Sequence, residues 1–171
     1  MSAMRETFDR AFGPAFRPAR SVFALSAWIL LTFAVAAVAS VATPGEWYAG
    51  LHKPAWNPPG WLFAPVWTAL YLMMAFAAWL VWHRGGWAAQ ARPLGAFLLQ
   101  LALNGLWSWI FFGWHRPGLA FAEILLLWAA ILLTIRCFAP VSKPAAWLLV
   151  PYLAWVTFAS VLNLTLWRLN A

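Results

Sequence analysis

Five long hydrophobic stretches, separated by short polar connections, constrain this chain more than any other feature of its sequence. The first two, Ser21 to Gly45 and Pro54 to Trp82, are long segments without any Asp, Glu, Lys or Arg. Crossing a bilayer takes about 20 predominantly apolar residues. We therefore predict an all-α membrane protein, a bundle of five transmembrane helices, with spans at about residues 21–43, 62–82, 93–114, 117–138 and 144–167.

The composition excludes a soluble enzyme. Hydrophobic residues make up 65% of the 171 residues and charged residues only 9%, whereas about a quarter of a soluble domain is charged. The connections leave no room for a separate catalytic domain. No glycine-rich phosphate loop, nucleophile elbow or metal-binding Cys/His cluster occurs in the sequence. We assign no catalytic residue, no metal site and no obligatory cofactor on these grounds.

Proline marks where several of the helices begin. Pro93, Pro117 and Pro144 open the third, fourth and fifth stretches, and proline is tolerated in the first turn of a helix because the N–H that it lacks has no partner there. Pro58, Pro59 and Gly60 delay the second helix to about Trp61.

The positions of the basic residues predict how the chain is oriented in the membrane. If residues 1–20 form a basic cytoplasmic extension, eight bases lie inside and three outside, which favours an inside N-terminus and an outside C-terminus. Because the bases are scattered singly, we expect no nucleic-acid partner. The inner bases are Arg5, Arg10, Arg17, Arg20, Arg84, Arg92, Arg136 and Lys143, and the outer ones are Lys53, Arg116 and Arg168.

The longest connection, residues 44–61, reads PGEWYAGLHKPAWNPPGW and is rich in proline and tryptophan. Proline restricts the backbone, and aromatic rings prefer partly apolar surroundings, so this segment is predicted to fold over the outer mouth of the bundle as a lid. The alternative is an aromatic belt seated among the lipid headgroups.

Three of the predicted helices carry a polar and aromatic face. Polar side chains in the hydrocarbon region face the protein interior, so these faces should meet inside the bundle. They then either hold the helices together by hydrogen bonds or line a pocket for a flat, largely apolar ligand. The faces consist of Trp67, Tyr71 and Met74; Gln100, Asn104, Trp107, Ser108 and Phe111; and Tyr152, Trp155, Ala159 and Asn163.

Glu123 is the only acidic residue within a predicted span. One interpretation pairs it with Arg116 or places it at the interface, and the other makes it part of a proton relay. The three histidines, His52, His83 and His115, lie at the ends of spans, where interfacial roles are expected; haem ligation by His52 is the alternative.

Three segments carry a resemblance to a known family. WYAGLHKPAWNPPGWLFAPVWTALY, QLALNGLWSWIFFG and PYLAWVTFASVLNLTLWRLN closely resemble the translocator protein family, which includes the bacterial tryptophan-rich sensory proteins and the peripheral-type benzodiazepine receptor. The resemblance covers about residues 23–170. It implies a five-helix bundle, commonly a homodimer, that binds porphyrins such as protoporphyrin IX and haem, sterols, and isoquinoline carboxamides or benzodiazepines.

The resemblance also implies site residues. Tyr48 matches the loop tyrosine of the ligand pocket, Trp67 and Trp155 match the paired pocket tryptophans, and Asn104, Trp107 and Ala159 match pocket positions on the third and fifth helices. Of the family's sterol motif, Leu162 and Arg168 remain, but Leu164 stands where the tyrosine should be, so we expect weak cholesterol binding.

Three functions fit this resemblance. The chain either binds and senses or transports a tetrapyrrole, or degrades porphyrin in light with Trp67 or Trp155 as redox partner, or regulates tetrapyrrole traffic as a partner protein. A member from a bacterial cell envelope is expected, in the inner membrane by the charge count, with the outer membrane as the alternative. Gly95, Ala102 and Gly105, small residues on the third helix, are predicted to form the dimer contact. For Gly105 the alternative is a contact within one bundle.

Overall fold

The structure, a computed structural model, describes residues 18–171. Within that range, five helical segments are long and apolar enough to cross a membrane, which confirms the predicted fold class. The chain is a multi-pass integral membrane protein. Most of the predicted cytoplasmic extension, residues 1–17, lies outside the described residues.

The first two spans are single helices. Helix α2 (Pro18–Ser40) ends a few residues earlier than expected. Helix α4 (Gly60–Trp82) begins directly after Pro59, whose extended backbone caps the helix, as the proline and glycine cluster predicts. Between them lies α3 (Glu46–Gly50), a short helix within the long connection.

The third span begins earlier than the prediction placed it. Helix α5 (Gly86–Ser108) starts after a turn in which Gly85 and Gly86 have positive φ angles, a conformation that glycine adopts at little cost. The helix is interrupted at Gln90 by non-helical backbone angles. Pro93 therefore does lie in the first turn of a helical segment, but a short helical turn precedes that segment. A π-helical turn, η1 (Trp109–Gly113), ends the span.

The last two spans are α6 (Pro117–Phe138) and the pair α7 (Lys143–Leu148) and α8 (Val150–Leu169). The Ser142 hydroxyl accepts a hydrogen bond from the Ala145 amide and so caps α7. The fifth span was predicted as one helix, but it is divided at Leu149. Pro151 explains the division because it has no N–H to continue the hydrogen bonds of the preceding turn.

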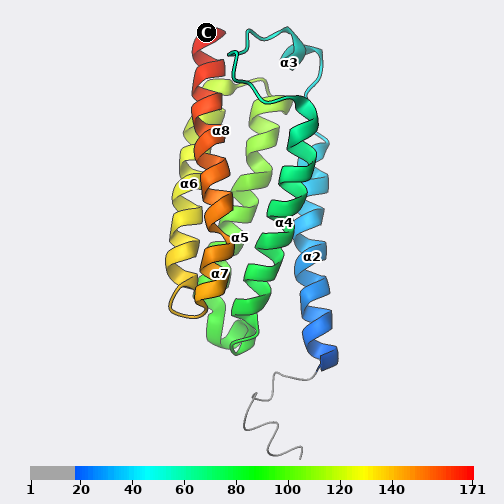
Figure 1. Cartoon of the computed structure of the whole chain (residues 1–171), viewed down its shortest axis with the longest axis vertical. Helices are drawn as coiled ribbons and strands as arrows, with labels where there is room; N and C mark the ends of the chain where they lie inside the picture. The colour runs from blue at the N-terminus through cyan, green and yellow to red at the C-terminus, as the bar shows by residue number, and fades with distance from the viewer. Residues whose placement is uncertain (1–17) are drawn as a thin grey trace, which may run out of the picture.

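The connections gather at two ends of the bundle (Figure 1). The α3 connection, the turn before α6 and the C-terminus lie together, and we call this the outer end. The start of α2 and the α4–α5 and α6–α7 turns lie at the opposite, inner end. Arg84, Arg136 and Lys143 are at or near the inner turns, and Lys53 and Arg116 are in the outer connections, so the charge distribution agrees with an inside N-terminus.

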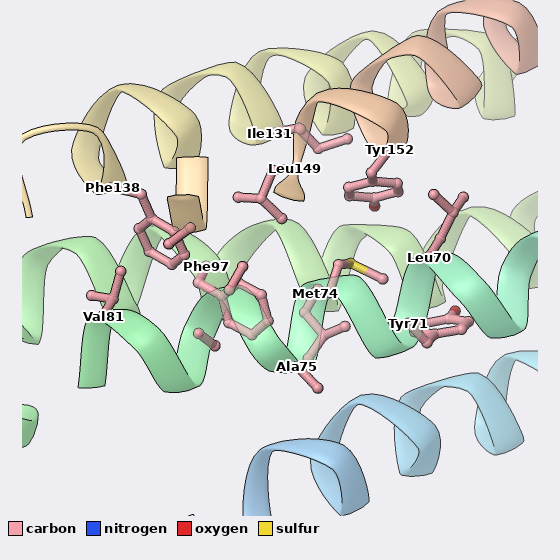
Figure 2. Close-up of a cluster of buried hydrophobic side chains, with 14 of the residues drawn as sticks. Leu70, Tyr71, Met74, Ala75, Val81, Phe97, Ile131, Phe138, Leu149 and Tyr152 are labelled. Carbon is pink, nitrogen blue, oxygen red and sulfur yellow. The ribbon is translucent and has the colours of Figure 1, made fainter. Parts of the chain in front are cut away.

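The inner half of the bundle is closely packed. Ala75, Ala77 and Ala78 of α4 are fully buried, and their small side chains allow α4 to pack closely against α2 and α7. Around them, Figure 2 shows Phe97 and Phe138, whose rings stack with centroids 6.1 Å apart.

Helix α2 lies at the periphery and is the least buried of the five spans. It packs on α4 and α5. Gly105 of α5 faces it: an added Cβ would lie 3.0 Å from Val35 of α2, so Gly105 serves a contact within one bundle. Gly95 and Ala102, the other two predicted dimer residues, are exposed.

We predict that the α3 connection faces outward and the α4–α5 turn faces the cytoplasm. The Cys137→Ser substitution first removes the one cysteine of the chain. In that background, the substitution Ala49→Cys, at an exposed position, should give a thiol that reacts with a membrane-impermeant reagent in intact cells. A cysteine at exposed Ala88 should react only after the membrane is permeabilised. The reverse labelling pattern would contradict the assigned topology.

Candidate functional site

The outer half of the bundle encloses a cavity of about 740 Å³. It lies among α2, α4, α5 with η1, α6 and α8, and residues of the α3 connection cover it. Its lining is predominantly apolar, as is usual for small-molecule sites. The structure brings all six predicted ligand-binding residues together here: Tyr48, Trp67, Asn104, Trp107, Trp155 and Ala159.

Bulky aromatic residues hold α4 and α8 apart at this level. Trp67 projects from α4 and Trp155 from α8, and both are half-buried. Phe63 of α4 meets Trp155 edge to face, with centroids 5.9 Å apart, and Trp67 meets Tyr152 of α8 at 6.3 Å. The two indoles thus flank the cavity from opposite helices, each with its orientation restricted by a second ring.

Two hydrogen-bonded links between helices form part of the polar wall of the cavity. The Tyr71 hydroxyl donates to Asn104 Oδ1 at 2.6 Å, which joins α4 to α5. The Trp107 indole donates to Asn163 Oδ1 at 3.1 Å, and Asn163 Nδ2 donates to the Pro117 carbonyl at 2.9 Å. The two interpretations of the polar faces, helix association and pocket lining, therefore apply to the same side chains.

The π-helical turn η1 places two neighbouring phenylalanines at the cavity. The Trp114 amide donates to the Trp109 carbonyl at 2.8 Å, the wider spacing of a π-helix. Phe111 and Phe112 of this turn both line the cavity. Nothing in the amino-acid types of this segment indicated the turn.

The α3 connection covers the cavity as the lid interpretation predicts. The Tyr48 ring packs edge to face on Phe112 at 5.4 Å, and its hydroxyl lies 3.4 Å from Asn57 Oδ1. Burial raises the pKa of Tyr48 above its usual value, an effect partly opposed by the contact with Asn57. Tyr48 is thus a neutral phenol at physiological pH. The Lys53 ammonium lies 4.8 Å from the centroid of the same ring, within cation–π range.

Two contacts fasten this lid to the rest of the bundle. The His52 amide donates to Asn170 Oδ1 at 2.8 Å, and Asn170 Nδ2 donates back to the His52 carbonyl at 3.0 Å. Trp47 stacks on His115 with centroids 4.4 Å apart. The belt interpretation stays a prediction for Trp61, which is 72% exposed.

The prediction of an interfacial or paired Glu123 is wrong. Its side chain is only 5% exposed and lies inside the bundle, and neither carboxyl oxygen has a hydrogen-bond partner among the described residues. The helical spacing explains this, since Glu123 shares the buried face of α6 with Ala120, Ile124 and Leu127.

The three histidines and Arg168 lie outside the cavity lining, whereas Leu162 of the sterol motif is part of it. His52, His83 and His115 are not among the cavity residues. Leu162 is buried and lines the cavity, whereas Arg168 is exposed near the outer end of α8. The two motif residues therefore do not form one surface.

Comparison with known sequences identifies the family. Residues 27–168 match the TspO/MBR family. The chain belongs to this family. It is 47% identical over 156 residues to a tryptophan-rich protein TspO from Chlorobaculum tepidum, covering 88% of this chain and 98% of that protein.

The chain is also similar to family members from a mammal and from another bacterium. The human translocator protein is 47% identical over 127 residues, 73% of this chain and 75% of its own length. The tryptophan-rich sensory protein of Cereibacter sphaeroides is 40% identical over 149 residues, 84% of this chain and 92% of its own length. The resemblance inferred from the three motifs is thus confirmed, and the chain is a member of a family of membrane sensory and translocator proteins.

Several contributors to the cavity of this TspO/MBR member were not assigned as site residues from the sequence. The sequence did place Tyr71 and Asn163 on the helix faces that point into the bundle, because both are polar residues in otherwise apolar helices. Helix α2 contributes Phe33, Ala36 and Ser40, but its uniformly apolar sequence gave no contrast between faces. The contact of Asn170 with His52 had no sequence signal, since 118 residues separate the partners.

We predict that Asn170→Ala loosens the lid of this family member. Two hydrogen bonds to the His52 backbone are lost, each worth about 0.5–1.5 kcal/mol. Hydrogen exchange at the His52 amide should accelerate by at least roughly fivefold. Thr165→Ala is the matched control, because its hydroxyl bonds only to the Val161 carbonyl of its own helix. Equal exchange in both variants would show that Asn170 does not hold the lid.

Proposed function

We propose that the cavity binds a flat tetrapyrrole, protoporphyrin IX or haem, and that the protein acts in tetrapyrrole sensing, regulation or transport. One observation carries this proposal: Trp67, Trp107 and Trp155, from three different helices, surround one predominantly apolar cavity of about 740 Å³. That volume lies within the range of about 300–1,000 Å³ typical of ligand sites. Broad aromatic walls suit a planar, hydrophobic molecule.

The charges at the outer end support one orientation of such a ligand. Lys53 lies over Tyr48, a residue of the lid that lines the cavity, and Arg116 precedes α6 at the same end. In this proposal the macrocycle lies between the aromatic walls and its propionates face these cations. Isoquinoline carboxamides and benzodiazepines would share the apolar part of the cavity. Sterol would bind weakly, because Leu162 and Arg168 do not form one surface.

We predict that Trp67→Ala and Trp155→Ala each weaken protoporphyrin IX binding. Removing one stacked ring should cost about 1–3 kcal/mol, taking base stacking as the analogy, or roughly five- to a hundred-fold in dissociation constant. The measurement is displacement of a bound isoquinoline carboxamide by protoporphyrin IX in lipid nanodiscs. Fluorescence quenching is less suitable, since 15 tryptophans would also report partitioning into lipid.

The control for this experiment is Trp147→Ala. Trp147 is 71% exposed on α7, away from the cavity lining, so its removal should leave the dissociation constant near that of the parent protein. If all three variants weaken binding equally, or none does, the aromatic faces only pack helices and the proposed site is wrong.

The same preparation distinguishes binding from porphyrin breakdown. If the protein only binds protoporphyrin IX, illumination should reduce the porphyrin absorption no faster than it does in nanodiscs without the protein. Loss of the spectrum in light that requires Trp67 and Trp155 would favour the enzymatic alternative, since both indoles line the cavity.

The dimer is the second part of the proposal. Gly95 and Ala102 are exposed on α5, and small residues let helix backbones approach closely in lipid. Replacing both with leucine should shift the mass distribution in nanodiscs or mild detergent toward the monomer. An unchanged distribution would exclude this contact.

A further inference from the structure

The exposed part of the cavity lining lies on one side of the bundle. The lining residues from α5, η1, α6, α8 and the α3 connection after Pro44 are buried or half-buried, except Gly60 at the start of α4. The exposed ones belong to the end of α2, the residues directly after it, and the outer half of α4. They are Ser40, Thr43, Pro44, Gly60, Ala64 and Thr68. The cavity therefore opens along the boundary between the outer halves of α2 and α4, which we call the α2–α4 seam.

The seam extends into the membrane-spanning part of the bundle. Gly60, Ala64 and Thr68 lie on successive turns of one face of α4, and Thr68 is about 12 Å along the helix from Gly60. One turn deeper, the rings of Phe33 on α2 and Tyr71 on α4 lie 6.0 Å apart and close the seam. Figure 2 shows Tyr71 on the side of α4 that faces α2. Because α4 is long and apolar enough to span a membrane, this opening faces lipid as well as water.

Small side chains border the seam without closing it. Ser40, Ala64 and Thr68 are exposed, whereas Ala75 and Ala78 in the inner half of α4 are fully buried. The hydroxyl groups of Ser40 and Thr68 donate to backbone carbonyls of their own helices, each at 2.8 Å. Their protons are thus not available to join α2 to α4. The outer halves of the two helices can separate there without breaking these bonds.

The lid offers a more obstructed route to the same cavity. Two hydrogen bonds join His52 to Asn170, and Trp47 stacks on His115. A ligand that entered through the lid would have to break these contacts. A ligand that entered through the seam would displace lipid and small apolar side chains.

We propose that the α2–α4 seam is the entrance to the cavity, through which a flat apolar molecule dissolved in the outer half of the bilayer reaches the aromatic walls without passing the lid. Such a molecule is concentrated in lipid because water disfavours its apolar surface. The inference rests on the proposed function for the kind of ligand, and it adds the route and the phase from which the ligand comes.

Labelling of a cysteine inside the cavity tests this entrance without a ligand. In the Cys137→Ser background, Ala159→Cys places a thiol in the cavity on α8, a helix that does not border the seam. The thiol adds across the C=C bond of a maleimide and forms a thioether. The reagents are flat, lipid-soluble N-pyrenylmaleimide and small N-methylmaleimide. The ratio of their labelling rates in nanodiscs cancels the intrinsic reactivity of the thiol.

Ala64→Leu adds bulk at the seam and should lower the ratio of pyrenyl to methyl labelling roughly five- to a hundred-fold. Ala69→Leu is the matched control, because Ala69 is also exposed on α4 but is not part of the cavity lining. It should leave the ratio near that of the parent, and so should Asn170→Ala at the lid. A ratio that Ala64→Leu leaves unchanged, or that both leucine variants lower equally, overturns the proposal. A ratio that rises in Asn170→Ala overturns it as well, because the route would then pass the lid.

The binding kinetics of an isoquinoline carboxamide give a second measurement. In Ala64→Leu, association and dissociation should both slow, because an obstacle on the route hinders passage in both directions. Faster dissociation with unchanged association would make Ala64 only part of the wall and would overturn the entrance. Because the labelling experiment contains no ligand, failure of protoporphyrin IX binding does not affect it. Failure of the entrance in turn leaves the affinity prediction for Trp67 and Trp155 intact.

Discussion

The membrane interior offers no hydrogen-bond partners, and this constraint determines where each polar side chain of the bundle lies. Tyr71 and Asn104 pair across α4 and α5 at 2.6 Å, and Trp107 and Asn163 link α5 to α8 at 3.1 Å. Polar residues that pair in this way also line the cavity. The same side chains thus associate the helices and line the cavity, so a ligand that contacted them would also affect the packing of the outer half.

Side-chain size along α4 explains why the bundle is closed at one end and hollow at the other. Its inner half has the fully buried residues Ala75, Ala77 and Ala78, which permit close packing. Its outer half carries Phe63 and Trp67, whose rings meet aromatic residues of α8. The small residues let α4 approach its neighbours closely at the inner end, whereas at the outer end the rings of Phe63 and Trp67 lie between α4 and α8.

The sequence predicted those features that depend on local composition. The spans followed from charge-free length, and the polar faces of α4, α5 and α8 stood out against hydrophobic surroundings. It could not show the π-helical turn at Phe111 and Phe112, since the geometry depends on how α5 meets α6. The contact between Asn170 and His52 and the contribution of α2 depend on long-range packing. Glu123 was misplaced because its charge suggested the interface, although its helical position pointed inward.

The lid and the hydrogen-bonded pair of Tyr71 and Asn104 bound the cavity from opposite ends, and their chemistry differs. Lys53 and Arg116 give the outer end positive charge, while the deep end presents an uncharged phenol and an amide side chain. Under the proposed function, the anionic edge of a tetrapyrrole would face these cations at the outer end. The apolar remainder of the macrocycle would then lie against the aromatic walls, which would supply most of the affinity.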